Sequence, residues 1–567
     1  MDRDKKSIAI IILSIALIAS GIVNIFLTIK PEIQIAIPGS RTLNIGTFYG
    51  QWDLDPINSW EYKSRDIIKQ VCEGLYTYNL FDPNLGIVPL LAEDYGTWDS
   101  SRTHFTIPLR QNVWFHDGTP FNAEAVKWNF ERINWFMNGT GTLNTTLSQS
   151  HYLWKFLNGT LILDSTNPVT INNEYSVTFN LIAPYTILES LLCHTTAFIL
   201  SPNLTPEYEY ISTAYGRIVG TGPFVYDYYI ANSEIKIHRW DNYWREPAFF
   251  EELTIFFIKD STLMYNCILN QSIDYVLGNY CPPTYLSGFP EHLTIHFSNN
   301  SLSYCYLSMN NKKINKTWRQ AISYAIDYTY IISTLREGKA SRSNGPVAPN
   351  FPMYDPNIKA ATWDLAKARQ ILVNAGITTL TANDDTTGPI ADAWKAADFQ
   401  SWNYSYDIGN RFRRDLGVLL KDNLDLIGIE VIDQGMSWAD FMNISYGYLE
   451  PGGYDSLEFH CMEWGPDYLS AYNMIAPNFS NRSTFNSVQY HNHSVEMWLD
   501  EVQSETNATK RAELYSKILH QIVEVDMPFA FLYHSYLYCS HSNDLKNVPY
   551  NSLMAFDAWP IYRDSNS

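Results

Sequence analysis

The clearest pattern of hydrophobic and polar positions lies between residues 105 and 133. Residues 105–109 alternate Phe, Ile and Leu with polar or small residues, the period of two expected of a half-buried strand. Residues 117–120 read Asp-Gly-Thr-Pro and predict a tight turn. Asn122 is suited to cap a helix whose apolar residues 125–133 repeat at helical spacing. Strand, turn and capped helix together predict an α/β unit.

Similar patterns recur along the rest of the chain. Apolar or alternating runs predict strands at residues 43–46, 235–237, 306–310, 429–431 and 528–533. Helical spacing predicts helices at residues 67–71, 318–326, 365–372, 419–427 and 514–523, the third ending at Gly376. Turn-forming residues predict surface loops at 136–160 and 378–398. A chain of 567 residues exceeds one compact core, so an α/β protein of two or more domains is expected.

The first 30 residues differ from the rest of the chain. Residues 7–29 form a run of 23 positions without a charge, preceded by Arg3, Lys5 and Lys6. A bilayer core requires about 20 such residues, whereas a cleaved signal usually has a shorter apolar stretch. We therefore predict a transmembrane anchor at residues 1–30 with the body outside and a linker at residues 31–41; a long cleaved signal is the alternative.

Asn-x-Ser/Thr sequons are frequent and support an external location. Thirteen are present, at Asn138, Asn144, Asn158, Asn203, Asn270, Asn299, Asn315, Asn403, Asn443, Asn478, Asn481, Asn492 and Asn507. Each is a candidate glycosylation site only if it is exposed and translocated. General richness in Asn, Ser and Thr is the alternative explanation.

Charge and cysteine content exclude several classes of protein. The formal net charge of −20 argues against nucleic-acid binding, which requires a basic surface. The seven cysteines include no Cys-x-x-Cys pair, so they do not indicate zinc, and their pairing is open with at least one thiol free. His116 lies in a turn that suits a structural role, and His491 and His493 flank a sequon. No metal and no cofactor are expected.

Several short motifs carry a family resemblance. They are Glu73-Gly74-Leu75, the segment at residues 89–132, Gly220-Thr221-Gly222-Pro223, Asn242-Tyr243-Trp244, and the helix from Arg319 to Asp327. Together they resemble family-5 solute-binding proteins of ABC transporters, the oligopeptide, dipeptide and nickel group. The resemblance implies a two-lobed periplasmic-binding-protein-like fold of class II with a discontinuous first lobe. Its expected divisions are lobe 1 at 42–303 with a subdomain at about 85–205, lobe 2 at 304–527, and a return to lobe 1 at 528–567.

The resemblance also implies a ligand site between the lobes. The stretch Trp464-Gly465-Pro466-Asp467 and the earlier Trp438 resemble the family's second-lobe contacts. They imply Asp467 as partner of a ligand ammonium, the two tryptophans as walls and Gly465 as a backbone contact. Thr47, Phe48 and Tyr49 are the expected first-lobe contacts. The alternative is that both tryptophans belong to the core and Asp467 caps a turn.

Two departures from the family pattern leave the ligand open. Leu469-Ser470-Ala471 replaces a further Asp-Pro after the motif, and residues 404–407 lack the arginine that holds the ligand carboxylate in some dipeptide binders. Longer peptides or sugars therefore remain alternatives to dipeptides.

The expected activity is binding without catalysis. The chain has no Gly-x-Ser-x-Gly elbow, no His-Glu-x-x-His helix and no phosphate-binding glycine loop. The expected partners are a peptide or other small solute, ABC permease subunits, and the membrane through the N-terminal helix. A secreted hydrolase and a ligand-presenting sensor receptor are the alternatives from other classes.

Overall fold

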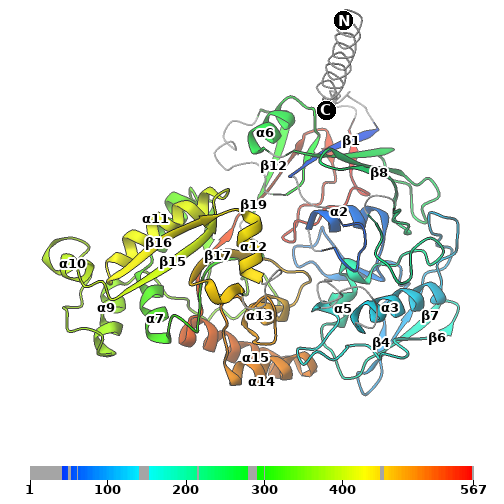
Figure 1. Cartoon of the computed structure of the whole chain (residues 1–567). Helices are drawn as coiled ribbons and strands as arrows, with labels where there is room; N and C mark the ends of the chain where they lie inside the picture. Colours follow the sequence, from blue (N-terminus) through cyan, green and yellow to red (C-terminus); the bar gives the residue numbers. More distant parts are fainter. Residues whose placement is uncertain are drawn as a thin grey trace, which may run out of the picture.

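Two large mixed sheets, each flanked by helices, dominate the structure (Figure 1). This computed structural model describes residues 41–48, 53–59, 62–138, 152–212, 216–258, 260–278, 290–298, 301–446 and 453–564. Within these ranges no helix is long and apolar enough to cross a membrane. The anchor expected at residues 1–30 lies outside them.

The first sheet has seven strands, in the order β12-β19-β11-β1-β10-β9-β8. Their bounds are β1 Thr42–Thr47, β8 Phe224–Ile230, β9 Glu234–Arg239, β10 Glu252–Phe257, β11 Tyr275–Val276, β12 Leu293–Ser298 and β19 Leu537–Ser542. The central strand β1 runs parallel to both neighbours, β10 and β11. This sheet belongs to the first lobe, and it confirms the strand predicted at residues 43–46.

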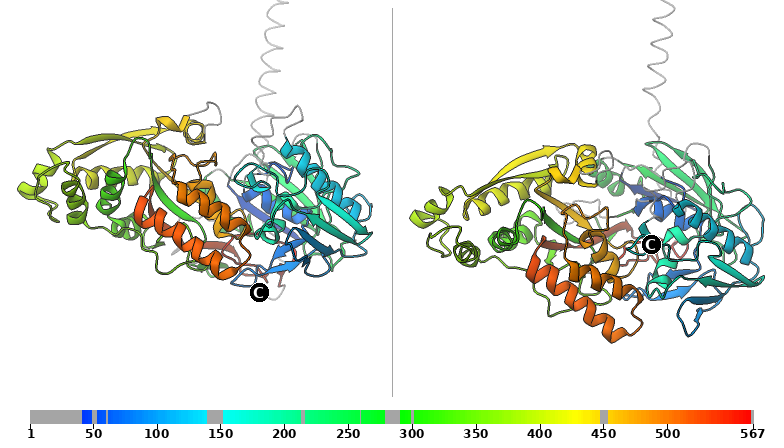
Figure 2. Two further views of the ribbon diagram at one scale, coloured as in Figure 1. Left: turned by 90° about the horizontal axis from the view of Figure 1, so that it is seen from below. Right: turned by 60° about the horizontal axis from the view of Figure 1, so that its bottom comes forward.

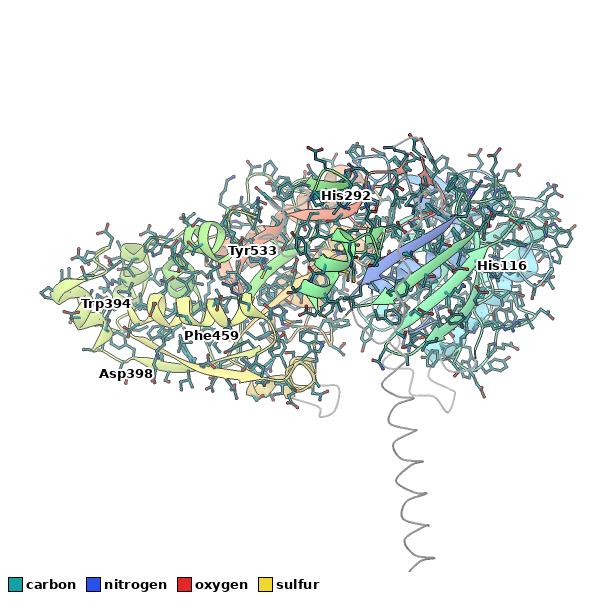
Figure 3. The ribbon with its side chains drawn as sticks, turned by 90° about the horizontal axis from the view of Figure 1, so that it is seen from above. His116, His292, Trp394, Asp398, Phe459 and Tyr533 are labelled. Carbon is teal, nitrogen blue, oxygen red and sulfur yellow. The ribbon has the colours of Figure 1, made fainter. Side chains whose placement is uncertain are left out.

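The second sheet has six strands, in the order β14-β18-β13-β17-β15-β16. Their bounds are β13 Tyr304–Met309, β14 Ala340–Arg342, β15 Gln400–Asp407, β16 Ile429–Met436, β17 Phe459–Trp464 and β18 Phe529–Ser535. Every residue of β13 and of β18 is buried. Figure 3 shows Phe459 and Tyr533 within this lobe and Trp394 toward its outer end.

The chain returns to the first sheet one strand later than expected. The apolar run that begins at residue 528 forms β18, which pairs antiparallel with β13 and β14 of the second sheet. Only the next strand, β19, pairs with β11 and β12 of the first sheet. The predicted return at residue 528 is therefore wrong. Both strands are fully buried, so periodicity does not distinguish their sheets.

The remaining strands form three smaller sheets. A four-stranded sheet, β4-β5-β7-β6, lies within the residue range of the expected subdomain, and β2-β3 and β20-β21 form pairs. Their bounds are β2 Tyr76–Tyr78, β3 Ile87–Pro89, β4 Thr97–Trp98, β5 His104–Pro108, β6 Val169–Asn173, β7 Ser176–Asn180, β20 Leu545–Lys546 and β21 Tyr562–Arg563. Helix α3 (Ala123–Asn138) packs on β6 and β7. Asn122 Oδ1 accepts the Ala125 N–H at 3.1 Å, which confirms the predicted cap.

The remaining helices cover the two large sheets and join the lobes (Figure 2). Their bounds are α2 Tyr62–Val71, α5 Leu188–Leu192, α6 Ser261–Leu269, α7 Lys316–Ala325, α8 Tyr328–Tyr330, α9 Leu365–Asn374, α10 Gly388–Lys395, α11 Arg411–Asp425, α12 Trp438–Tyr446, α13 Ala471–Phe479, α14 His493–Ser504 and α15 Ala508–His520. Short 3₁₀ segments are η2 Thr195–Ala197 and η5 Gly453–Ser456, and π segments are η4 Ile331–Leu335 and η6 Gln521–Asp526. The predicted helix at 514–523 thus ends as α15 and continues as a π segment.

One hydrophobic core crosses the expected division at residue 304. Side chains of α13, α14 and α15 belong to the same buried cluster as those of the subdomain. The hydroxyl of Tyr78 accepts the Leu469 N–H at 3.0 Å, and the Ser190 hydroxyl donates to the Leu469 carbonyl at 3.1 Å. The end of the chain's second half is therefore packed tightly against its first half, beside the ligand site described next.

Candidate ligand-binding site

A cavity of about 800 Å³ lies between the two large sheets. On one side it is lined by the residue after β1, by α2, by β19 and by the loop at 552–555. On the other side it is lined by β13, β17, β18 and the start of α11. Aromatic and aliphatic side chains alternate on these walls with charged groups of both signs. A cavity of this size and composition suits a small organic solute.

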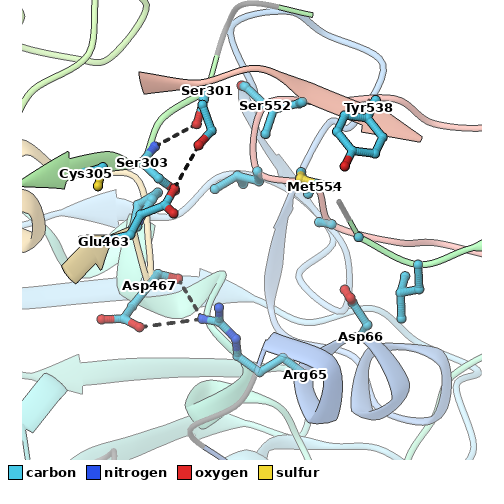
Figure 4. A pocket seen from close by; sticks show the side chains of 18 of the residues that line it. Arg65, Asp66, Ser301, Ser303, Cys305, Glu463, Asp467, Tyr538, Ser552 and Met554 are labelled. Carbon is cyan, nitrogen blue, oxygen red and sulfur yellow. Dashed lines mark hydrogen bonds and ion pairs between the residues drawn. The ribbon is translucent and has the colours of Figure 1, made fainter. Parts of the chain in front are cut away.

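An ion pair joins the two sides of the cavity (Figure 4). Arg65 of α2 lies with its Nη1 3.8 Å from Asp467 Oδ1 and 3.4 Å from the Asp467 carbonyl oxygen. The same nitrogen lies 3.0 Å from His194 Nε2. Burial and the Arg65 charge hold the pKa of His194 well below its usual range, so this ring is neutral and its Nε2 accepts a hydrogen bond from the Arg65 guanidinium. Arg65 therefore bridges the lobes within the ligand cavity.

Asp467 is held in place by its own loop. Asn473 Oδ1 accepts the Asp467 N–H at 2.7 Å, and Asn473 Nδ2 donates to Asp467 Oδ2 at 3.0 Å. Trp464 Nε1 donates to the Asn473 carbonyl at 3.0 Å and its ring packs on Phe485. These contacts fix the direction of the Asp467 carboxylate.

The carboxylate of Asp66, on α2, also faces the cavity. Asp66 Oδ1 accepts the Phe556 N–H at 3.2 Å. Burial raises the pKa of Asp66 to about 7, although the neighbouring charges of Arg65 and Lys69 oppose this effect. Near neutral pH this group is therefore divided between its neutral and charged forms.

Two arginines face the cavity from the second lobe. Arg413 donates to Asp407, and its N–H donates to Asn410 Oδ1 at 3.1 Å, so the cap of α11 positions it. Arg336 directly follows the π segment η4 and lies 4.9 Å over the Tyr533 ring and 5.6 Å over the Phe412 ring. Among the described residues its Nε has no hydrogen-bond partner. Cationic groups are thus available to an anionic part of a ligand.

Glu463 of β17 supplies the remaining charge of this wall (Figure 4). Removal of the carboxylate from bulk water inside the cavity raises its pKa, and the charges of Arg336 and Arg413 oppose this effect. The Ser535 hydroxyl lies 3.5 Å from Glu463 Oε1. Charges of both signs therefore lie on the second lobe's wall as well.

Comparison with known proteins decides the family. The family described as "Bacterial extracellular solute-binding proteins, family 5 Middle" matches residues 86–486. The chain belongs to this family. The resemblance seen in its motifs is confirmed, and a role as an extracytoplasmic binding protein, not an enzyme, follows from membership.

Curated relatives of this family 5 protein bind different solutes. Heme-binding protein A of Haemophilus influenzae is 25% identical over 467 residues, 79% of each chain. Glutathione-binding protein GsiB of Pectobacterium atrosepticum is 25% identical over 340 residues, which span 57% of this chain and 59% of that relative's length. These matches support the family without fixing the ligand.

Solved structures share the fold of this family 5 protein. DppA from Helicobacter pylori, in complex with the peptide STSA, has a TM-score of 0.74 at 19% identity and covers 94% of this chain and 100% of its own. AppA from Bacillus subtilis, in complex with a nonapeptide, has a TM-score of 0.70 at 20% identity, covering 92% and 99%. They confirm the mixed α/β periplasmic-binding-protein-like fold.

In this family 5 protein, some of the expected site residues line the cavity and others lie outside it. Asp467, Gly465, Pro466 and Phe48 line the same cavity. Trp464 does not line it and instead supports the Asp467 loop, and Trp438 is 51% exposed outside the lining.

One first-lobe contact expected from the resemblance is described by the structure but is not found in the cavity wall. Thr47 is fully buried and is absent from the lining. Tyr49 lies outside the described residues. The expected walls at Trp438 and Trp464 and the contact at Thr47 are therefore not part of this cavity, because burial and exposure place those side chains elsewhere.

The sequence reasoning missed six charged residues of the cavity: Arg65, Asp66, Lys69, Arg336, Arg413 and Glu463. A signal existed only for Arg413, which stands three positions after the helix cap Asn410. Arg65 and Arg336 owe their positions to contacts between distant segments. No local sequence pattern predicts those contacts.

His116, which the sequence analysis considered for a chemical role, has a structural role. His116 Nε2 lies 2.9 Å from the Gly222 carbonyl oxygen, and burial lowers the pKa of His116 to about 4. It ties the turn at residues 117–120 to the Gly-Thr-Gly-Pro segment, at the first-lobe position labelled in Figure 3. Within the described ranges no group of three His, Cys, Asp or Glu side chains is arranged to hold a metal ion.

The sequons differ in exposure. Exposed asparagines are Asn158, Asn203, Asn270, Asn315, Asn481 and Asn507, and half-buried ones are Asn403, Asn443 and Asn492. Asn478 is 1% exposed and its Nδ2 donates to the Tyr304 hydroxyl, so the candidate at Asn478 is wrong for the folded chain. Asn144, Asn299 and the Asn138 side chain lie outside what the structure describes.

Proposed function

We propose that this family 5 protein captures peptides in the cavity between its lobes and delivers them to an ABC permease. The observation that carries the proposal is the distribution of charge in one cavity of about 800 Å³. Carboxylates of Asp66 and Asp467 and guanidinium groups of Arg336 and Arg413 all face this space. A zwitterionic chain with an ammonium and a carboxylate is complementary to that arrangement.

In this proposal the ligand ammonium binds Asp467. The Asn473 contacts hold the carboxylate toward the cavity, and Gly465 offers backbone groups beside it. The Arg65 contact to Asp467 Oδ1 is long, at 3.8 Å, so an ammonium at hydrogen-bond distance competes favourably with it. The ligand carboxylate binds Arg413 or Arg336.

The proposal includes the location of the protein. Residues 7–29 anchor the chain in the membrane with the body outside, and the exposed sequons carry glycans. Tethering keeps the binding lobes close to the permease, which raises the local concentration of loaded protein at its partner.

The experiment is a ligand screen followed by a variant series. Melting temperature is measured with peptide, oligosaccharide, glutathione and heme libraries, and Kd is then measured by calorimetry. Peptides are expected to stabilise the protein. Asp467→Asn is expected to weaken peptide binding about tenfold or more, since a hydrogen bond to a charged group contributes about 1.5–3 kcal/mol.

Trp438→Ala is the control for this series. Its position outside the cavity lining predicts an unchanged Kd, whereas a wall role predicts a loss. Stabilisation by sugars or heme alone, or an unchanged Kd in Asp467→Asn, would reject peptide capture through Asp467.

A further inference from the structure

Two free cysteines meet in the wall of the ligand cavity. Cys305 of β13 and Cys461 of β17 are both buried, both line the cavity, and their Sγ atoms lie 3.6 Å apart (Figure 4 shows Cys305 beside Glu463). This separation is van der Waals contact between two thiols. A chain that functions outside the cytoplasm meets conditions in which neighbouring thiols are oxidised.

The strand pairing places the two thiols on neighbouring strands but not directly opposite each other. Cys305 stands opposite Glu463 and Leu307 stands opposite Cys461 in the antiparallel β13–β17 pair. Cys305 and Cys461 are therefore diagonal neighbours on one face of the sheet, since side chains two positions apart share a face. The register between β13 and β18 also shifts at Cys305 and Tyr306, an irregularity of the kind that re-aims a side chain.

Burial and the neighbouring charges have opposite effects on this pair. Burial and the adjacent Cys461 thiol raise the pKa of Cys305 well above its usual range. The guanidinium of Arg413 acts on both sulfurs and that of Arg336 acts on Cys305. Positive charges near a cysteine stabilise the thiolate, the reactive form in disulfide exchange, so the two guanidinium groups oppose the effect of burial, although the net pKa of Cys305 stays raised. Two fixed guanidinium groups also oppose the binding of a metal cation.

We infer that Cys305 and Cys461 form a redox-active dithiol that a small disulfide oxidant converts into a disulfide in the cavity wall. The Cys461 thiolate attacks one sulfur of the oxidant, which forms a mixed disulfide and releases one thiolate. The Cys305 thiolate then attacks Cys461 Sγ and releases the second thiolate. The protein loses two electrons and two protons, and the oxidant becomes two thiols.

The bond links strands that shape the ligand site. Joining the sulfurs requires them to move from 3.6 Å to about 2.0 Å apart, which draws β13 and β17 together. Strand β17 carries Glu463 and leads directly into Gly465 and Asp467. Oxidation is therefore expected to weaken solute binding several-fold. This consequence rests on the proposed function, whereas the cross-link does not.

The first test maps the bond without any ligand. The full chain is reduced, treated with oxidised glutathione, blocked with an alkylating agent, digested, and analysed by mass spectrometry. The expected product is a peptide pair joined through Cys305 and Cys461. Cys193→Ser is the matched control, because Cys193 is a cavity thiol whose Sγ donates to the Glu189 carbonyl at 3.4 Å, and it should leave the cross-link intact.

The second test measures consequences. Oxidised protein should melt several degrees higher than reduced protein, because the bond closes a long loop, and Cys305→Ser should abolish this difference. Full alkylation of both thiols after oxidant overturns the proposal. So does a metal ion bound at the pair that blocks the cross-link. Failure to bind peptides rejects the proposed function and leaves the cross-link result unaffected.

Discussion

At the scale of single residues, the cavity combines charges that the sequence could predict with others that it could not. Asp467 is marked by a motif, and the structure places it in the cavity. Arg65 lies beside it only because two distant segments meet, since α2 and the loop after β17 are about 400 positions apart in the chain. Sequence patterns report local spacing, so they predict a motif residue and not its partner across a cavity.

Asp66 provides a prediction about pH at this scale. Its pKa of about 7 in the folded protein exceeds the ordinary aspartate value of 3.8, so between these pH values the folded chain holds a proton that the unfolded chain has released. The free energy of unfolding therefore falls as pH rises from about 4 to about 7. Asp66→Asn should flatten this part of the pH profile, measured by urea denaturation at a series of pH values.

The Asn variant is a close control because its side-chain oxygen can still accept the Phe556 N–H. At pH 8 the variant should be more stable than the wild-type protein, and near pH 4 the two should be alike. Parallel profiles for the two proteins across this range would show that Asp66 titrates normally in the fold.

At the scale of elements, patterns predicted several of the helices and strands but not the sheet to which each strand belongs. Asn122, Gly376 and the apolar run at 318–326 mark elements that the structure contains. Strand β18 was assigned to the wrong lobe because its seven residues are all buried and carry no preference for one sheet. Arg336 was missed because a π segment interrupts the regular helical spacing just before it.

Helix caps explain part of the excess of sequons. Asn315, Asn492 and Asn507 are the N-cap residues of α7, α14 and α15, and each accepts a backbone N–H through Oδ1. A glycan attaches through Nδ2, so it is compatible with a cap at the exposed Asn315 and Asn507. At Asn492 the Nδ2 donates to Asp526 at 2.8 Å, which leaves no room for that modification.

Variants of Asn507 can therefore distinguish its role as a helix cap from its proposed role as a glycosylation site. Asn507→Ala should remove the cap of α15 and destabilise the protein by about 1 kcal/mol in urea denaturation. Asn507→Asp keeps an oxygen acceptor for the Lys510 N–H, so it should retain the stability while losing the glycan. Equal destabilisation by both variants in protein made without glycosylation would contradict a capping role.

At the scale of the whole molecule, the lobes meet through the contact of Arg65 with Asp467 inside the cavity, through hydrogen bonds of Tyr78 and Ser190 with Leu469, and through a shared apolar core. The core that joins α13, α14 and α15 to the subdomain holds the chain's two halves together. Arg65 and Asp467 meet within the cavity itself, with side chains 11% and 23% exposed. A solute that enters must therefore compete with an ion pair that already links the lobes.

This competition predicts the effect of removing the Arg65 charge. In Arg65→Gln the Asp467 carboxylate loses its guanidinium neighbour, so a peptide with a free ammonium should bind about tenfold more tightly, the scale of one charge-assisted hydrogen bond. The same peptide with an acetylated amino group should show no gain. Lys69→Gln is the matched control, since it removes the same charge from α2 within the cavity lining.

Calorimetry with the two peptides on the three proteins separates the possibilities. A gain confined to Arg65→Gln and to the free ammonium places the ligand's amino end at Asp467. A loss of affinity for both peptides in Arg65→Gln would instead mean that Arg65 itself holds the ligand, and the ammonium site would then be Asp66. An equal gain of affinity in Lys69→Gln would show that the effect comes from the overall electrostatic potential of the cavity and not from the contact of Arg65 with Asp467.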